Sequence, residues 1–258
     1  MRNYEIPNLS NACLVLKTLA SEPAGLLLSE LVQRLELPHT SALRIVATLC
    51  NAGFLQRSGN RYELGSGLIP LGQQALARLD IRSVARPALN HLSAQTGETA
   101  HLAILSGNQS LLVEVCQSPA PIRVGAPAGT LAALHCSATG KVLLAGQPDN
   151  RLELLLGTKP LPAQTRKTLT TLPQLRQELI RIRKQGYAVD EEEFFEGIRC
   201  LAAPVHNASG DLVGAIGITG ASTRFTAPRI PSVARQVIAA ANSVSKGLGC
   251  SKMPCLTR

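Results

Sequence analysis

The sequence predicts an α+β fold in two parts: a small N-terminal domain of helices and a hairpin, and a larger domain with a mainly antiparallel sheet. Three observations carry this prediction. Residues 9–50 repeat apolar side chains at helical spacing in three short stretches, and residues 54–64 then switch to a hairpin pattern. Beyond residue 80, helical stretches alternate with strand-like runs that short Gly- and Asn-containing turns connect. The length of 258 residues allows one large domain or two modest ones, at about 100 to 200 residues per domain.

Three helices are expected before residue 51. The first covers residues 9–20, behind Asn8 as a candidate N-cap, and the second follows Ser29, which is suited to cap it. The third runs over His39–Cys50, and Pro38 suits its first turn because the N–H that proline lacks would be unpaired there. The tight connection between the second and third helices is typical of a helix-turn-helix.

The third helix is expected to have two faces. The apolar side chains that we expect to face inward are Leu43, Val46, Leu49 and Cys50. On the other face, short polar or basic side chains recur at steps of three and four, at Thr40, Ser41, Arg44 and Thr48.

The hairpin pattern after the third helix completes the outline of a winged helix-turn-helix. Residues 54–57 and 61–64 have extended character and flank the turn Ser58-Gly59-Asn60. Residues 1–80 as a whole carry seven Lys and Arg against six Asp and Glu, so a DNA contact in this half needs a local basic patch. Residues 37–62 supply one, because they hold three basic residues and no acidic one.

The polar face of the third helix is therefore the candidate surface for double-stranded DNA. A helix fits the major groove, and short polar side chains at its front allow close approach to the bases. Arg57 and Arg61 in the hairpin are expected to contact phosphate or the minor groove, and so to set register more than sequence preference. The alternative is a small helical packing module whose polar face is only solvated. The predicted DNA-binding residues of the third helix are His39, Thr40, Ser41, Arg44 and Thr48.

These patterns divide the chain into four segments. Residues 1–66 are expected to form the winged helix-turn-helix domain, residues 67–80 a linker helix, residues 81–250 the larger domain and residues 251–258 a tail. The larger domain is expected to contain helices closed by glycines and strands joined as antiparallel hairpins. The expected helices are 84–95, 173–185 and 232–246, and the expected strands are 100–105, 111–116, 122–125, 201–205 and 212–219.

Composition and charge exclude several other classes of protein. The longest nearly uncharged apolar stretch, Leu212–Ala221, is far shorter than the about 18 residues of a spanning helix, and residues 1–4 begin no signal peptide. We therefore expect a cytoplasmic protein with no membrane partner. Seven scattered cysteines, none in a C-x-x-C pair, indicate neither a disulfide framework nor a zinc site. The net charge of +9 is compatible with nucleic acid or an anionic ligand as a partner.

Three sequence motifs occur in a defined order along the chain. They are Leu37–Arg44 at the start of the third helix, the small-residue and leucine-rich segment His135–Ala145, and Gly186–Val205 with its Gly-Tyr-Ala-Val-Asp and Arg-Cys-Leu-Ala-Ala-Pro-Val sequences. Together they resemble the IclR family of transcriptional regulators, over about residues 9–247. The resemblance implies that the larger domain is a GAF-like effector-binding domain. It also implies homodimers formed through N-terminal elements, often paired further into homotetramers.

The resemblance further implies which residues bind a small-molecule effector. In regulators of this family, effectors occupy a pocket formed by a small-residue turn, an acidic residue, a cysteine and the last strand. From the residues alone, the segment after Ser137 is either a helix start whose free N–H groups receive an anion such as a carboxylate, or a place of close packing. Carried over to this chain, the effector-binding residues are Ala138, Thr139, Asp190, Cys200, Gly217 and Thr219.

Two positions refine that expectation. Gly217 stands where family members with small-acid effectors often have Ser, so it removes a hydroxyl and leaves space for a bulkier effector. Asp190 begins an acidic run that includes Glu193, and such a run is usually a solvated face. We expect Asp190 alone to face the pocket, because Val189 and Phe194 bracket it, and we expect the glutamates to lie outside.

An enzyme is the competing class of function. Cys200 or Cys136, with His135, His206 or Asp190, could supply a nucleophile and a base for a small-molecule-metabolising cysteine-dependent enzyme. The spacing matches no nucleophile elbow, P-loop or metal pattern, and a thiol at the head of a buried strand is ordinarily a small hydrophobe. We therefore predict no catalytic residue, no cofactor and no metal. The predicted function is a DNA-binding transcriptional regulator whose operator affinity a small, carboxylate-bearing effector modulates.

Overall fold

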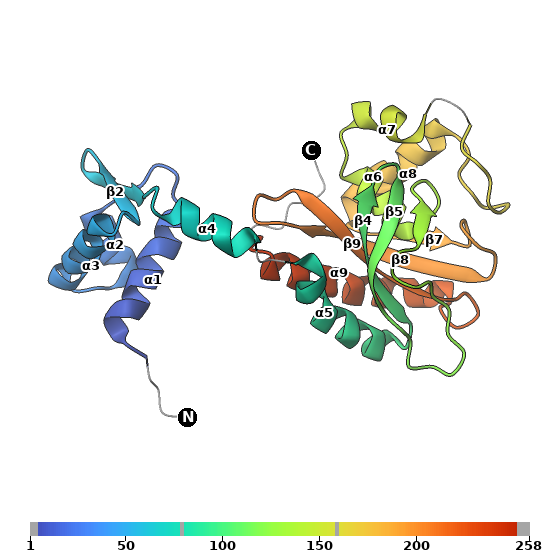
Figure 1. The fold of residues 1–258 in the computed structure, drawn as a ribbon, viewed down its shortest axis with the longest axis horizontal. Helices are drawn as coiled ribbons and strands as arrows, with labels where there is room; N and C mark the ends of the chain where they lie inside the picture. The colour runs from blue at the N-terminus through green and yellow to red at the C-terminus, as the bar shows by residue number, and fades with distance from the viewer. Residues whose placement is uncertain (1–4, 78–79, 158–159, 252–258) are drawn as a thin grey trace. The chain divides into compact units, whose positions relative to one another are not determined.

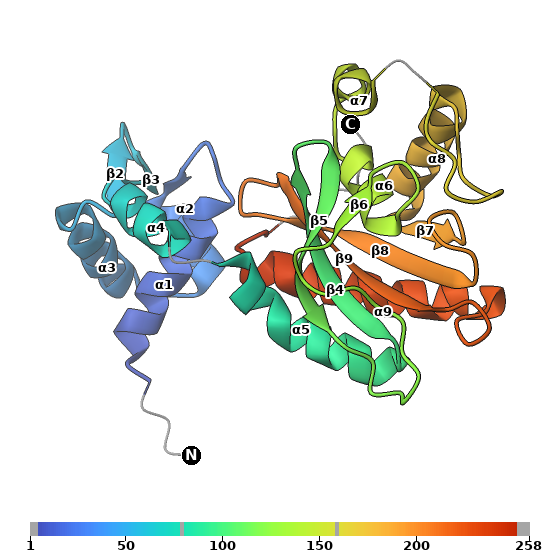
Figure 2. The same cartoon turned by 45° about the vertical axis from the view of Figure 1, so that its right-hand side comes forward.

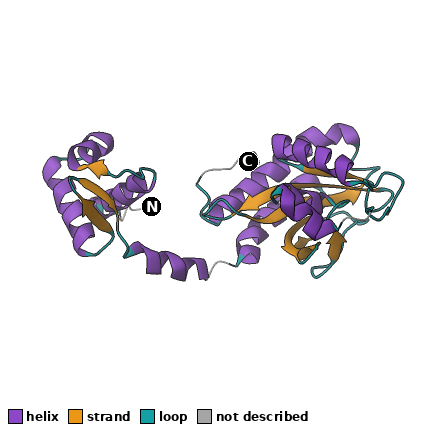
Figure 3. Cartoon of the chain, turned by 90° about the horizontal axis from the view of Figure 1, so that it is seen from above, coloured by secondary structure: helices purple, strands orange, loops and turns teal. Residues whose placement is uncertain are grey.

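The chain folds into two compact units in the computed structural model, residues 1–78 and residues 79–258 (Figure 1). The structure describes residues 5–77, 80–157 and 160–251, so the expected tail lies outside the described residues from position 252 onward. Each unit combines helices with an antiparallel sheet, which confirms the α+β prediction (Figure 3).

The N-terminal unit is a winged helix-turn-helix, as the sequence predicts. Three helices pack around one apolar core, and a hairpin forms the wing, with a third short strand beside it in the order β1-β3-β2. In chain order the elements are α1 (Pro7–Ala20), β1 (Leu26–Leu27), α2 (Leu28–Leu35), α3 (His39–Asn51), β2 (Leu55–Ser58), β3 (Arg61–Leu64) and α4 (Leu68–Ala77). The core consists of Val15, Leu19, Leu26, Leu31, Ile45, Val46, Leu49 and Leu55.

Two expected helix caps are wrong. The helix α1 begins at Pro7, so Asn8 lies inside it, and no side chain caps its start. Ser29 does not cap α2 either, because Glu30 does so: its carboxylate Oε2 accepts the Leu27 N–H at 2.7 Å. A carboxylate is a stronger acceptor than a hydroxyl, which explains why the glutamate and not the serine holds this helix start.

The linker helix expected over residues 67–80 is α4, which ends at Ala77, and positions 78–79 lie outside the described residues. Asp80 does not belong to it. The Asp80 side chain accepts the Arg82 N–H at 3.0 Å and thereby caps the following helix, α5 (Ile81–Thr96). An aspartate with extended backbone is a favoured N-cap, so the chain starts a new helix at this point.

The C-terminal unit is built on a six-stranded antiparallel sheet in the order β6-β5-β4-β9-β8-β7 (Figure 2). The helices α5 and α9 pack against one face through the larger apolar core, and α6 and α8 pack against the other. After α5, the elements in chain order are β4 (Thr99–Ser106), β5 (Gln109–Cys116), β6 (Leu131–Ala133), α6 (Ala138–Ala145), α7 (Asp149–Leu156), α8 (Leu172–Gln185), β7 (Ala188–Glu191), β8 (Ile198–His206), β9 (Leu212–Ala221), a 3-10 turn η1 (Ala227–Arg229) and α9 (Ile230–Gly247).

The strand expected at residues 122–125 is wrong. These residues form no strand, and the edge of the sheet is β6, which pairs with β5. Prolines at 119, 121 and 127 flank the segment, and proline cannot donate to a strand ladder. Residues 117–130 therefore form a loop, and part of this loop closes one side of the site described below.

The register of the sheet places two rows of side chains on the face toward α6. The first row, called here the polar row, crosses four neighbouring strands through directly paired positions: Thr99, Thr219, Cys200 and Asp190. The second row lies two residues further along each strand: His101, Gly217, Ala202 and Ala188. The alternate positions Ala100, Ile218, Leu201 and Val189 belong to the core with α5 and α9.

Candidate functional site

The recognition helix α3 has a buried stripe and an exposed polar face. Its buried residues are Ala42, Ile45, Val46 and Leu49. Leu43, which was expected to face inward, is 45% exposed, because it falls one position off this stripe. The predicted DNA-binding residues of α3 are on the outer side: His39, Thr40, Arg44 and Thr48 are exposed and Ser41 is half-buried.

Arg44 is available for an external partner. Within the described part of the chain, no side chain forms an ion pair or hydrogen bond with its guanidinium. The backbone carbonyl of Arg44 accepts the Thr48 hydroxyl at 2.7 Å, so Thr48 turns back onto its own helix. The exposed polar face of α3 is thus led by Arg44 and the short side chains at the front of the helix.

The two arginines of the wing differ in what holds them. Arg57 is exposed, and its Nε donates to the Gly59 carbonyl at 2.8 Å across the turn. Arg61 is tied inward, because its Nη1 donates to the Gly25 carbonyl at 2.9 Å and pairs with Glu30 Oε2 at 3.2 Å. Arg61 therefore fastens the wing to the start of α2, which leaves Arg57 as the freer of the two for phosphate.

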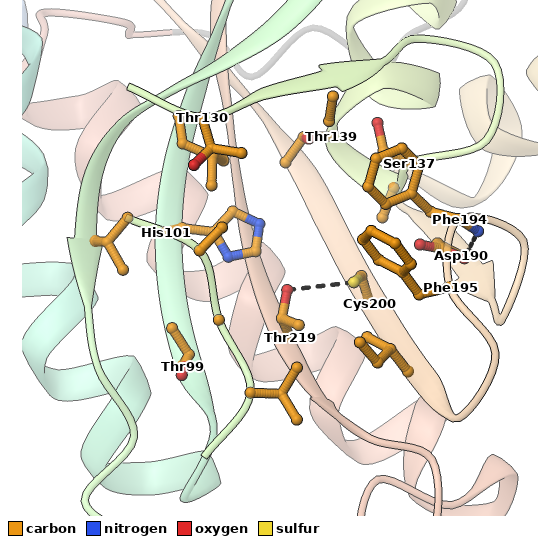
Figure 4. A pocket seen from close by; sticks show the side chains of 18 residues that line it. Thr99, His101, Thr130, Ser137, Thr139, Asp190, Phe194, Phe195, Cys200 and Thr219 are labelled. Carbon is orange, nitrogen blue, oxygen red and sulfur yellow. Dashed lines mark hydrogen bonds between the residues drawn. The ribbon is translucent and has the colours of Figure 1, made fainter. Parts of the chain in front are cut away.

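A cavity of about 140 Å³ lies above the polar row in the C-terminal unit (Figure 4). The row supplies its floor, α6 and the loop 117–130 contribute walls, and two phenylalanines that follow β7 also line it. Five of the six expected effector-binding residues line this cavity: Ala138, Thr139, Asp190, Cys200 and Thr219. The fold thus brings together predicted residues that span 81 positions of the chain, from Ala138 to Thr219.

The sixth expected residue, Gly217, does not line the cavity, and the expectation that it leaves space for a bulkier ligand is wrong. A Cβ at this position would lie 3.0 Å from His101 Nε2 and 2.8 Å from the Leu201 carbonyl oxygen. The room that glycine leaves is therefore filled by the His101 imidazole from the neighbouring strand. His101 lines the cavity instead.

The start of α6 presents backbone donors to the cavity. Ser137 caps the helix: its Oγ accepts the Gly140 N–H at 3.2 Å and donates to the Ala133 carbonyl at 2.6 Å. The N–H groups of Ala138 and Thr139, in the first turn, have no acceptor among the described residues. Gly140 is required here, since a Cβ would lie 2.6 Å from the Leu134 backbone.

Asp190 is a buried carboxyl group at the β7 end of the polar row. Its Oδ1 accepts the N–H groups of Glu193, at 2.7 Å, and Phe194, at 3.2 Å, and so shapes the loop that carries the phenylalanines (Figure 4). Burial raises the Asp190 pKa from 3.8 to about 6, against the effect of these hydrogen bonds and of Lys141. A site that keeps a carboxyl close to its titration point at neutral pH is a functional candidate.

Asp190 lines the cavity and none of the glutamates after it does, as expected, but Glu193 is not solvated. Glu193 is buried and pairs with the Lys141 ammonium, which is also buried and donates to the Val189 carbonyl at 2.6 Å. This pair joins α6 to the loop after β7 beneath the cavity. The hydroxyl of Thr168 donates to the Glu193 carbonyl at 2.7 Å and anchors the same loop.

Several cavity residues were missed at the level of sequence. Thr99 and His101 could have been found by extending the two-residue alternation of β4, since both fall on the face of the polar row. Phe194 and Phe195, whose rings meet edge to face at 4.6 Å between centroids, carry no comparable signal because the loop that holds them is irregular.

Neither Cys200, which lines the cavity, nor Cys136, which lies just before the α6 cap Ser137, has an activated thiol. Cys200 Sγ lies 3.2 Å from Thr219 Oγ1, and burial raises its thiol pKa well above the ordinary value. Burial, with Asp190 nearby, raises the pKa of Cys136 to about 12. Within the described residues, no three His, Cys, Asp or Glu side chains gather to hold a metal ion. None of the helices described is long and apolar enough to cross a bilayer.

A winged helix-turn-helix with an exposed polar recognition helix, joined to a separate domain with a small-molecule cavity, defines a ligand-responsive DNA-binding regulator. Residues 9–59 match the IclR helix-turn-helix domain, and residues 73–246 match the family described as bacterial transcriptional regulator IclR C-terminal. The chain belongs to the IclR family of transcriptional regulators, and its C-terminal unit is the effector-binding domain of that family.

Individual relatives agree with this assignment. The chain is 34% identical over 231 residues to the HTH-type transcriptional regulator BhcR of Paracoccus denitrificans, which covers 89% of this chain and 83% of that protein. It is 29% identical over 249 residues to the transcriptional repressor IclR of Escherichia coli, and the match covers 95% of this chain and 91% of that protein. The crystal structure of the repressor BlcR of Agobacterium tumefaciens superposes with a TM-score of 0.84 at 26% identity, covering 96% of this chain and 99% of that one.

Proposed function

We propose that this regulator recognises its operator with the polar face of α3 and that one compact anionic molecule in the cavity changes its operator affinity. The observation that carries the DNA part is the exposed face of α3, on which the Arg44 guanidinium has no partner among the described residues. Arginine at the front of a recognition helix binds guanine edges or phosphate. Arg57 adds a phosphate contact from the wing.

The proposed effector is small and carries a single carboxylate. A cavity of about 150 Å³ takes one benzene molecule, so the volume of about 140 Å³ here suits a compact ring or short chain. The unpaired N–H groups of Ala138 and Thr139 suit one carboxylate at the start of α6. The lining contains no Lys or Arg, so a second anionic group would meet no cation and would face Asp190. The proposed binding set is Ala138, Thr139, Asp190, Cys200 and Thr219.

Effector control requires that the ligand bind two conformations of the regulator with different affinity. A coupling of about 1 to 3 kcal/mol, or roughly 5- to 150-fold in operator affinity, is typical of such systems. The loop after β7 is suited to respond, because Asp190 in the cavity floor accepts the backbone N–H of Glu193, whose side chain forms the buried ion pair with Lys141.

We propose that the functional unit is a homodimer or homotetramer in the cytoplasm. One helix-turn-helix contacts too little DNA for high specificity, and a dimer would bind two half-sites about one helical turn apart. Exposed apolar side chains support a self-contact in the N-terminal unit: Ile6 just before α1, and Leu9 and Leu14 on α1, are between 46% and 63% exposed. Sedimentation of the full chain measures this state directly.

We propose further that the chain has no enzymatic activity. A cysteine nucleophile reacts as its thiolate, and burial holds the thiol pKa of both Cys136 and Cys200 far above neutrality. A turnover assay with Cys200→Ala distinguishes the classes, since a cysteine-dependent enzyme would lose its activity in that variant.

The test of the proposed function is a gel-shift titration with the DNA adjoining the protein's own gene, repeated with pooled metabolites. Arg44→Ala should abolish specific binding, while Asp190→Ala should leave DNA affinity intact and remove the metabolite response. Arg181→Ala is the matched control, because Arg181 is an exposed arginine of the C-terminal unit that pairs only with Glu178. Specific binding that survives Arg44→Ala, or a metabolite response that survives Asp190→Ala, contradicts the assignment.

A further inference from the structure

His101 is a buried side chain in the cavity wall that the proposed binding set does not include. It comes from β4, is 6% exposed and points into the cavity near Thr219 (Figure 4). Burial lowers the pKa of His101 to about 4, although a hydrogen bond to the backbone of Thr99 opposes this effect. The imidazole is therefore neutral at physiological pH.

The His101 ring has no side-chain hydrogen-bond partner among the described residues. A neutral imidazole has one N–H donor and one acceptor nitrogen. Because the ring lines the cavity, a ligand in the cavity is the partner within its reach, and a hydroxyl group can pair with either ring nitrogen.

Gly217 shows that the fold makes room for this imidazole. His101 and Gly217 are directly paired across β4 and β9, and a Cβ at position 217 would lie 3.0 Å from His101 Nε2. Any other residue at 217 would push the ring or the strand aside, because Leu201 on the next strand also lies close. A glycine inside a strand often marks such a close approach.

The ligand group that pairs with His101 is better a hydroxyl than an ammonium group. An ammonium group would pair with a carboxylate, and the carboxyl group of the polar row is Asp190 on β7. Three strand spacings separate β7 from β4, which is about 14 Å. Apart from Asp190 and His101, the polar side chains in the lining are uncharged: Thr99, Thr130, Ser137, Thr139, Cys200 and Thr219. The larger apolar side chains in the lining are Leu112, Val115, Val124, Phe194, Phe195 and Ile198.

We propose that His101 selects the effector by a hydrogen bond between its imidazole and a hydroxyl group of the effector, so that the effector is a compact hydroxy acid with one carboxylate and an apolar body. This inference rests on the proposed effector site and adds its specificity. His101 is the specificity-determining residue, and Gly217 positions it.

Matched ligand pairs test the proposal by calorimetric titration of the full chain. The probes are benzoate with its three monohydroxy isomers, and butyrate with 3-hydroxybutyrate. We expect at least one hydroxylated probe to bind about tenfold more tightly than its parent acid. In His101→Phe, which keeps a flat ring without nitrogen, the preference should fall below about threefold. His101→Gln, which keeps an acceptor, should retain part of it, and His91→Phe, on the exposed side of α5, should retain all of it.

Each outcome decides the question. Parent acids that bind as well as their hydroxylated partners, or a preference that survives His101→Phe, overturn the role of His101 and leave the effector site standing. Failure of every hydroxylated probe to bind overturns the hydroxy-acid class. The proposed function is judged separately, by the gel shift with pooled metabolites and Asp190→Ala. If His101→Phe fails to fold, a preference lost in Gly217→Ala, where the added methyl displaces the ring, supports the proposal, and one that persists there overturns it.

Discussion

Replacing Asp190 with asparagine should stabilise the protein, and more so at high pH than at low pH. The folded state holds the Asp190 proton up to a pKa of about 6, whereas the unfolded chain releases it near 3.8. Stability therefore falls as the pH rises through this window and stays low above it. A pKa that rises from 3.8 to about 6 corresponds to a cost of about 3 kcal/mol at pH 8 and about 1.6 kcal/mol at pH 5.

Asparagine removes that cost and keeps the oxygen that accepts the Glu193 and Phe194 N–H groups. Asp190→Asn also loses the attraction to Lys141, so about 3 kcal/mol is the upper limit of the gain. For a unit of this size, about 1 kcal/mol moves the melting temperature by roughly 2 to 4 °C. The transition of the C-terminal unit should therefore rise by up to about 6 to 12 °C at pH 8, and by about half as much at pH 5.

Differential scanning calorimetry of the full chain at pH 5 and pH 8 measures these shifts. Asp211→Asn is the control, because Asp211 is an exposed carboxylate of the same unit, whereas Asp190 is buried. Its transition should shift by the same small amount at both values of pH. A loss of stability in Asp190→Asn at both values, or a gain that does not grow with pH, would refute the reasoning.

Three further predictions concern other parts of the molecule. Lys141→Met should destabilise the C-terminal unit by about 3 to 5 kcal/mol in urea unfolding, because it leaves the Glu193 carboxylate buried without its cation. The double variant Lys141→Met/Glu193→Gln should recover most of this lost stability. Arg224→Lys should keep the charge beside buried Glu98 but lose the bond of Nη1 to the Ile122 carbonyl, which is 3.1 Å long. Hydrogen exchange should therefore accelerate about tenfold or more in residues 119–126, and unchanged exchange would contradict this. The loss of operator binding in Arg44→Ala should be accompanied by a slope of log K against log salt that is lower by about 1 if the guanidinium binds phosphate, and by little change in slope if it binds a base edge; unchanged affinity contradicts both.

The fold could be predicted largely because its signals are local. Helical spacing over residues 9–50, a hairpin after Gly53 and glycine-closed helices in the second half each depend on a few neighbouring residues. The errors arose where an apolar pattern was followed although nearby residues contradict it. Leu43 follows an apolar pattern but lies off the buried stripe of α3, and residues 122–125 are apolar enough for a strand but have prolines on both sides.

The site residues could be predicted where motif residues fall on one face of the sheet. They could not be predicted where packing across neighbouring strands determines which side chain reaches the cavity. Asp190, Cys200 and Thr219 lie in one paired row. The role of Gly217 depends on His101 more than a hundred residues earlier, and that contact follows from the register of β4 with β9, which no local pattern contains. The ion pair of Lys141 with Glu193 likewise requires knowing that α6 crosses over β7.

The central claim is that the exposed front of α3 provides the DNA specificity of this regulator. A fluorescence-anisotropy titration of the DNA adjoining its own gene, with wild type and a Thr40→Ala/Ser41→Ala/Arg44→Ala variant, tests it most directly. All three side chains lie outside the core of the N-terminal unit, so the variant should fold and melt as the wild type does. We predict that its affinity for this DNA falls to the level of unrelated DNA. A folded variant that still prefers the operator as strongly as the wild type would contradict the account.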